Sequence, residues 1–88
     1  MRYPALFTPE NAGFVVTFRD LPEAITQGDD EVDAMFMAKD VLREAIDAYL
    51  DEKRPIPPPS SAQPGERLIP LCARLAEEIR AAVAARIV

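Results

Sequence analysis

The stretch from Phe18 to Asp30 constrains the fold more than any other part of the chain, because three changes of local structure fall within it. Apolar and polar residues alternate before this stretch, whereas apolar residues recur every three or four positions after it. Pro22 favours a turn, and Gly28 ends a short run of strand-forming residues. The chain is therefore predicted to pass from a strand through a turn and a short strand into a long helix.

Two segments near the start of the chain have the period-two pattern of half-buried strands. Residues 2–8 and 13–19 flank the turn-forming residues 9–13, and together they predict an antiparallel hairpin. Residues 24–27 predict a third, short strand. The apolar positions that share one side of each strand are Tyr3, Ala5, Phe7, Phe14, Val16 and Phe18.

A long helix is predicted from the pair Asp29-Asp30, either of which is a natural N-cap, to about Lys53. Its apolar positions recur at three- and four-residue spacing and form one broad stripe, which we expect in the core. The run Met35–Met37 cannot face inward as a whole, so Met37 is the residue expected to remain available for self-association. The stripe consists of Val32, Met35, Phe36, Val41 or Leu42, Ala45, Ile46, Tyr49 and Leu50.

The second half of the chain returns to the sheet and then forms another helix. Residues 55–65 are a Pro-rich, extended connector with a flexible tail, and residues 66–71 predict a fourth strand. The expected fold is therefore α+β, with a β-β-β-α-β domain over residues 1–71, its long helix on one face of the sheet, and a C-terminal helix over residues 72–88. That last helix has an apolar seam, expected to be exposed and to favour a homodimer or higher homo-oligomer, formed by Leu75, Ile79, Val83 and Ile87.

Charge is unevenly distributed along the 88 residues, whose formal net charge is −5. Residues 1–54 hold six basic and twelve acidic residues, whereas residues 55–88 hold four basic and three acidic residues. Six of the acidic residues lie between Asp20 and Ala38, a span without Lys or Arg. An acidic surface repels the nucleic-acid backbone and attracts cations or basic proteins. The first part of the chain is therefore not expected to bind nucleic acid by itself.

Histidine is absent, and Cys72 is the only cysteine. This composition excludes intramolecular disulfides, the usual zinc ligand sets and histidine-based nucleophilic triads. We expect Cys72 to be a small buried side chain rather than a reactive thiol. The chain has neither a charged-then-apolar leader nor a long apolar span, which favours a cytoplasmic protein without membrane contact.

The acidic residues leave several interpretations open. A metal-dependent nuclease needs several converging carboxylates, but the first strand contains none and Asp20 follows the second strand. We therefore expect no catalysis, no metal and no cofactor. Helix capping accounts for Asp29 and Asp30, and turn formation accounts for Asp20 and Glu23. Contact with a basic protein is the alternative for these four residues.

Seven short motifs occur in a specific order in the first 60 residues. They are Met1–Ala5, Gly13–Phe18, Asp20–Glu23, Thr26–Asp29, Ala38–Leu42, Tyr49 and Ile56–Ser60. In this order and at these spacings, they make residues 1 to about 71 resemble the HicB family of antitoxins from bacterial type II toxin–antitoxin pairs.

The resemblance implies a partial ribonuclease-H-like domain that binds a HicA toxin, a small basic protein that cleaves mRNA with a histidine. Because a toxin that grips RNA must be basic, we expect the acidic domain to attract it and to neutralise it by covering its active face, without chemistry of its own. The residues expected to contact the toxin are Asp20, Leu21, Glu23, Asp29 and Asp30.

Members of this family also carry a DNA-binding segment with which they repress their own operon. Residues 72–88 resemble the lead-in to such a segment, so operator binding is expected only in a longer natural chain. Repression of the toxin–antitoxin operon is the alternative function. Its candidate basic residues are Arg67, Arg74, Arg80 and Arg86.

Overall fold

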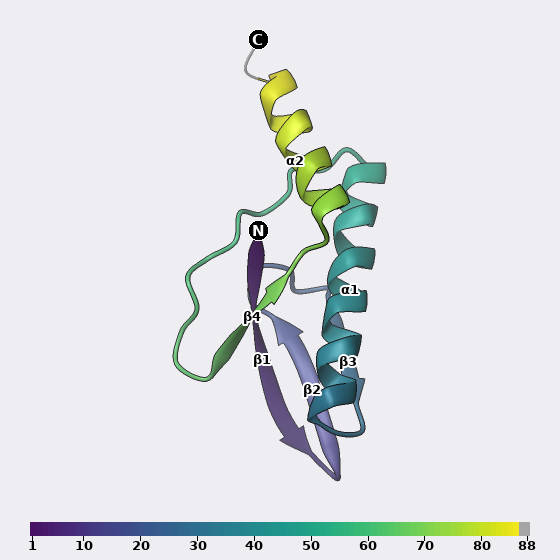
Figure 1. Ribbon diagram of the computed structural model, residues 1–88, viewed down its shortest axis with the longest axis vertical. Coiled ribbons are helices and arrows are strands. Elements are labelled where there is room, and N and C mark those ends of the chain that lie inside the picture. The colour runs from purple at the N-terminus through teal and green to yellow at the C-terminus, as the bar shows by residue number, and fades with distance from the viewer. Residues whose placement is uncertain (87–88) are drawn as a thin grey trace.

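The computed structural model describes residues 1–86, with side chains described through residue 83, and shows a four-stranded sheet with two helices (Figure 1). The predicted α+β class and the β-β-β-α-β order followed by a helix are confirmed. The elements are β1 (Arg2–Glu10), β2 (Gly13–Phe18), β3 (Ile25–Gly28), α1 (Glu31–Asp51), β4 (Glu66–Pro70) and α2 (Ala73–Arg86).

The sheet has the strand order β3-β2-β1-β4, and every neighbouring pair is antiparallel. The predicted hairpin of β1 and β2 is confirmed, but β1 extends through Pro9 and Glu10, which pair with Phe14 and Gly13. Pro9 fits there because the ladder with β4 ends at Leu6, so its missing N–H group faces no partner strand. The turn is therefore shorter than predicted.

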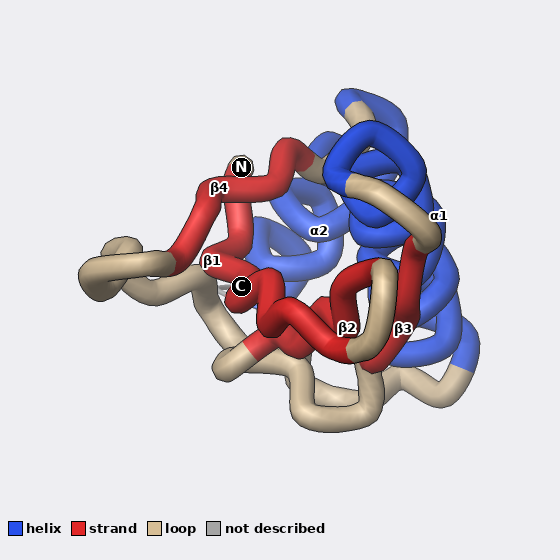
Figure 2. The backbone as a smooth tube through the Cα atoms, turned by 90° about the horizontal axis from the view of Figure 1, so that it is seen from below, coloured by secondary structure: helices blue, strands red, loops and turns tan. Residues whose placement is uncertain are grey.

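Both helices lie on the same side of the sheet, which curves around them (Figure 2). The long helix α1 begins after Asp30, whose side chain accepts a hydrogen bond from the Asp33 backbone N–H at 2.7 Å. This confirms Asp30 as the N-cap, an interaction that stabilises a helix by about 1 kcal/mol. The residues that α1 buries against the sheet are Ala34, Ala38, Leu42, Ile46 and Tyr49.

The predicted apolar stripe is wrong for two residues, Val32 and Phe36. Their exposed fractions are 81% and 67%, because the buried row of α1 passes through Ala34 and Ala38, and Phe36 lies two residues from either of them. Met37, which is expected at the surface, is only partly exposed. The large apolar residues that α1 leaves in solvent are therefore Val32 and Phe36 rather than Met37.

The start of α1 packs closely on β3, where Gly28 lies against Ala34. A Cβ atom added to Gly28 would lie 2.4 Å from the Ala34 backbone N and 2.5 Å from its Cα. A Cβ atom on Gly13 would lie 2.2 Å from the Gly28 carbonyl oxygen. The first turn of α1 therefore rests directly on the backbone of β3, and this contact leaves no room for a larger side chain.

The apolar seam of α2 is mostly buried in the chain's own core. Leu75 and Ile79 pack into the same hydrophobic cluster as Tyr3 and Ile69, so the prediction of an exposed seam is wrong for these two residues. Val83 is 52% exposed and remains available for contact. Ile87 lies outside the described residues, and self-association through this helix or through Met37 remains a prediction.

Candidate functional site

The acidic stretch predicted from the sequence is divided into two groups in space. Asp20 and Glu23 lie before β3, and Glu23 lies beside Tyr49 near the end of α1. Asp29, Asp30 and Asp33 lie after β3, around the start of α1. The four residues of β3 separate the groups by roughly 13 Å of extended chain. The carboxylates do not form one continuous cluster.

The side chains of Asp20 and Leu21 make their contacts within the domain. The Asp20 carboxylate accepts hydrogen bonds from the Ser60 backbone N–H and from the Ser60 hydroxyl, each at 2.7 Å, and its side chain is only 11% exposed. Leu21 is fully buried. The Leu21 side chain therefore cannot contact a partner in this conformation, contrary to expectation, and both Asp20 oxygens are already occupied within the chain.

The Pro-rich connector, residues 55–65, is extended, as predicted, and hydrogen bonds hold it to the domain at several points. The Tyr3 hydroxyl donates to the Pro57 carbonyl at 2.8 Å, and burial raises the pKa of Tyr3 to about 12. Arg19 donates to the Ser61 carbonyl at 2.9 Å. With the Asp20–Ser60 bonds, these contacts hold the connector against the sheet.

A bidentate ion pair between Arg19 and Glu66 lies at the C-terminal end of the connector. Arg19 Nε and Nη2 donate to the two oxygens of Glu66 at 3.2 and 2.9 Å, and the Gln63 backbone N–H donates to Glu66 Oε1 at 2.7 Å. The Arg19 guanidinium, followed by the Gln63 amide, lowers the pKa of Glu66 below its ordinary value of 4.5. The charged form of Glu66 is therefore the one that the fold favours.

The Glu66 ion pair predicts a pH-dependent contribution to stability. Because the folded-state pKa is lowered, the contribution is present above pH 4.5 and is lost as the pH falls through the folded-state value. The melting temperature of the wild-type chain should exceed that of Glu66→Gln at pH 7, and the difference should shrink below pH 4.5. A difference that stays constant between pH 7 and pH 3 would contradict this assignment.

Glu23 is exposed, and its charge is retained at neutral pH. The Tyr49 hydroxyl lowers the pKa of Glu23, and the same contact raises the pKa of Tyr49. The Arg54 guanidinium stacks over the Tyr49 ring at 4.1 Å from its centroid. Glu23, one of the residues predicted to contact a partner, is thus an exposed anion beside the C-terminal end of α1.

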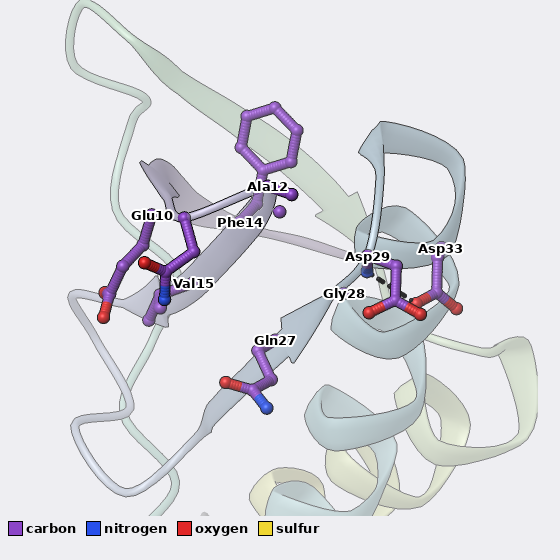
Figure 3. A pocket seen from close by; sticks show the side chains of 10 residues that line it. Glu10, Ala12, Phe14, Val15, Gln27, Gly28, Asp29 and Asp33 are labelled. Atoms are coloured by element: carbon purple, nitrogen blue, oxygen red, sulfur yellow. Dashed lines mark hydrogen bonds between the residues drawn. The ribbon is translucent and has the colours of Figure 1, made fainter.

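Asp29 and Asp30 are exposed at the opposite end of α1. The Asp29 backbone N–H donates to Asp33 Oδ2 at 2.9 Å, which complements the cap made by Asp30. A hollow of about 520 Å³ separates this helix start from the tip of the hairpin, and Glu10 lies across it from Asp29 and Asp33 (Figure 3). The helix cap thus also places two exposed anions on the surface.

The described residues hold no group of three or more acidic or cysteine side chains arranged to bind a metal ion. Cys72 is exposed, contrary to expectation, because it precedes α2 and lines a hollow beside Phe36. Within residues 1–86, no helix has the length and apolar character needed to span a membrane.

Three of the four basic residues considered for DNA contact are engaged with carboxylates, and the fourth, Arg86, lies outside the residues with described side chains. Arg67 pairs with Glu31 and stacks on the Phe7 ring. Arg74 pairs with Glu78 at 3.1 Å, and Arg80 pairs with Glu77 at 3.0 Å. The part of the chain with described side chains therefore presents these arginines in neutralised pairs rather than as one basic patch.

Sequence reasoning missed Val32 and Phe36 as candidate contact residues. They lie one turn apart on the outer side of α1. The sequence does contain a pattern that predicts their exposure, the row Ala34, Ala38 and Leu42 at four-residue spacing. A helix that buries this row directs Phe36 to solvent.

The fold and the exposed carboxylates around α1 define a small α+β domain with an acidic outer surface. Residues 2–79 match the family described as a HicB-like antitoxin of bacterial toxin–antitoxin systems. Antitoxin HicB 2 of Photorhabdus laumondii is 40% identical over 79 residues, which cover 90% of this chain and 55% of that protein. Antitoxin HicB of Escherichia coli K12 is 39% identical over 80 residues, covering 90% and 58% respectively. The chain belongs to the HicB-like antitoxin family.

The chain spans a little more than half the length of these curated relatives. The match extends beyond the sheet and α1 into α2, since it continues to residue 79.

Proposed function

We propose that this chain is an antitoxin that binds a basic, RNA-cleaving toxin of the HicA type and covers its active face without performing chemistry. The observation that carries the proposal is the array of exposed carboxylates around α1 in a chain that belongs to an antitoxin family. An RNA-cleaving toxin must attract phosphates, so its active face is basic and complementary to this surface. Occlusion is sufficient, because a covered active face cannot bind RNA.

Three of the residues predicted to contact the toxin are suited to guide its approach. Glu23, Asp29 and Asp30 are exposed and lie at opposite ends of α1, so their charges act on a basic protein over the whole length of the helix. Charges at the rim of an interface raise the association rate more than they raise the affinity. Asp20 and Leu21 support this surface from inside the domain.

A co-expression experiment tests the proposal. The gene beside that of this chain is expected to encode a small basic protein whose expression alone arrests growth. Co-expression of the two proteins should restore growth, and the two should co-purify as a complex. The neighbouring protein with its catalytic residue replaced should still co-purify, because occlusion does not depend on catalysis. Growth arrest that persists in the presence of this chain would refute the proposal.

Homodimer formation through Val83 and the neighbouring surface remains a proposal. Repression of the operon by a longer chain is a separate, second proposal. A gel shift with operator DNA distinguishes repression, because this acidic chain alone should leave the DNA unshifted.

A further inference from the structure

The outer side of α1 exposes two large apolar residues, Val32 and Phe36. Val32 and Phe36 lie four residues apart and therefore one above the other on the same face. A single exposed apolar side chain is common on protein surfaces and needs no explanation. A phenylalanine and a valine stacked along one helix face form a contact pair of the kind that anchors protein interfaces.

Phe36 stands between two hollows. One, of about 480 Å³, lies between the first turns of α1 and Arg67 of β4. The other, of about 390 Å³, lies between the middle of α1 and the segment Pro70–Cys72. Phe36 and Lys39 line both. The Phe36 ring is thus a ridge with a hollow on either side.

A stripe of acidic residues runs along α1 beside this ridge. Its members are seven, four, three and four residues apart, so they follow one line along the helix for about 27 Å. Arg43 contacts two of them, at 2.8 Å to Asp40 and 3.8 Å to Asp47. Among the residues with described side chains, no ion pair involves Glu44 or Asp51. The stripe consists of Asp33, Asp40, Glu44, Asp47 and Asp51.

Lys39, Arg43 and Arg67 also line the hollows beside Phe36, but α1 holds six acidic residues against two basic ones, so its outer face is acidic as a whole. This net charge selects the occupant of the face. A second copy of the chain would place an identical acidic stripe against this one, and like charges in contact disfavour that arrangement. A nucleic acid is repelled for the same reason. A basic protein surface with apolar side chains at its centre satisfies both the stripe and the Phe36 ridge.

We propose that the outer face of α1 is the docking surface for the basic toxin, with Phe36 and Val32 as the apolar anchor and the stripe from Asp33 to Asp51 as the electrostatic guide. This inference rests on the proposed antitoxin function and assigns it a surface. It differs from the contact set predicted from the sequence, which lies before and around β3. Phe36 determines how long the complex lasts, and the stripe determines how fast it forms.

The test is the kinetics with which the purified chain binds the small basic protein encoded by the adjoining gene. Phe36→Ala should raise the dissociation constant on the order of 30-fold, mainly through faster dissociation. Its control, Leu68→Ala, removes an exposed apolar side chain from β4, where alternation directs it to the face away from the helices. That control should bind within about twofold of wild type.

The stripe is tested with two double charge reversals that change the net charge equally. Glu44→Lys with Asp51→Lys should slow association on the order of 10-fold at low salt and weaken its salt dependence. Glu10→Lys with Glu77→Lys should change the rate by less than about threefold, because these residues lie off the stripe. Unfolding must be excluded for each variant by a melting temperature close to that of wild type, which their exposure leads us to expect.

The possible outcomes distinguish a failure of the proposed docking surface from a failure of the proposed antitoxin function. If wild type binds and both the Phe36 and the stripe variants bind as wild type does, the toxin docks elsewhere and this inference is overturned while the antitoxin function stands. If wild type does not bind the basic protein, both fail. Loss of binding by the α1 variants, with the controls intact, supports the surface.

Discussion

Replacing Gly28 by alanine is expected to destabilise the domain by about 3 kcal/mol, the largest effect that we predict for a single methyl group. The added Cβ would lie 2.4 and 2.5 Å from the backbone N and Cα of Ala34, and backbone atoms cannot move aside without displacing the start of α1. For a domain of this size, such a loss lowers the melting temperature by roughly 12–24 °C. Thermal unfolding followed by circular dichroism measures it.

A second substitution shows whether the backbone causes the effect. Ala34→Gly removes the Ala34 Cβ, 2.9 Å from the added atom, but leaves the closer backbone atoms in place. Gly28→Ala combined with Ala34→Gly should therefore remain as unstable as Gly28→Ala alone. Full recovery of the melting temperature, or a Gly28→Ala variant that melts with wild type, would show that α1 does not rest on β3 in this way.

Replacing Asp20 by alanine is expected to cost about 2–3 kcal/mol and to release the connector. The substitution removes two charge-assisted hydrogen bonds and leaves the partly buried Ser60 N–H without an acceptor. Limited proteolysis should then cut within residues 55–65, and the Ser60 amide should exchange with solvent faster than in wild type. Asp40→Ala is the control, because Asp40 belongs to an exposed ion pair and should cost less than about 0.5 kcal/mol.

This experiment also decides what Asp20 is for. A structural role predicts lower stability and a cut connector, with toxin affinity changed only as far as the fold is disturbed. A contact role predicts unchanged stability and weaker toxin binding. An Asp20→Ala variant with wild-type stability and an intact connector would contradict the structural assignment.

The strands and both helices were predictable from the sequence because their signals are local. Alternation in residues 2–19, the Pro22 turn and the acidic cap at Asp30 each depend on neighbours within a few positions. Their agreement with one another made the order of the elements predictable as well.

The side of α1 that faces the sheet was less predictable. Pattern reasoning favours large apolar residues for the core, but here Gly28 lies close to the backbone of Ala34, and α1 buries the small side chains of Ala34 and Ala38 in its first half. Phe36 is consequently exposed. That approach is a tertiary contact between β3 and α1, and the apolar pattern of α1 by itself does not contain it.

The hydrogen bonds that hold the connector to the domain could not be predicted from local sequence patterns either. Asp20 bonds to a residue 40 positions away, and Tyr3 bonds to one 54 positions away. A Pro-rich composition predicts an extended backbone correctly, yet it does not reveal which polar groups hold that backbone in place. For this reason the sequence suggested a contact role for Asp20, whereas the geometry assigns it an internal one.

The most direct test of occlusion is the rate at which the small basic neighbour cleaves RNA as this chain is added. Occlusion predicts that cleavage falls linearly to background at a 1:1 ratio, without added metal, and that the toxin's binding to RNA is lost over the same range. Cleavage that continues at wild-type rate in molar excess of this chain, with the two proteins in complex, would contradict it.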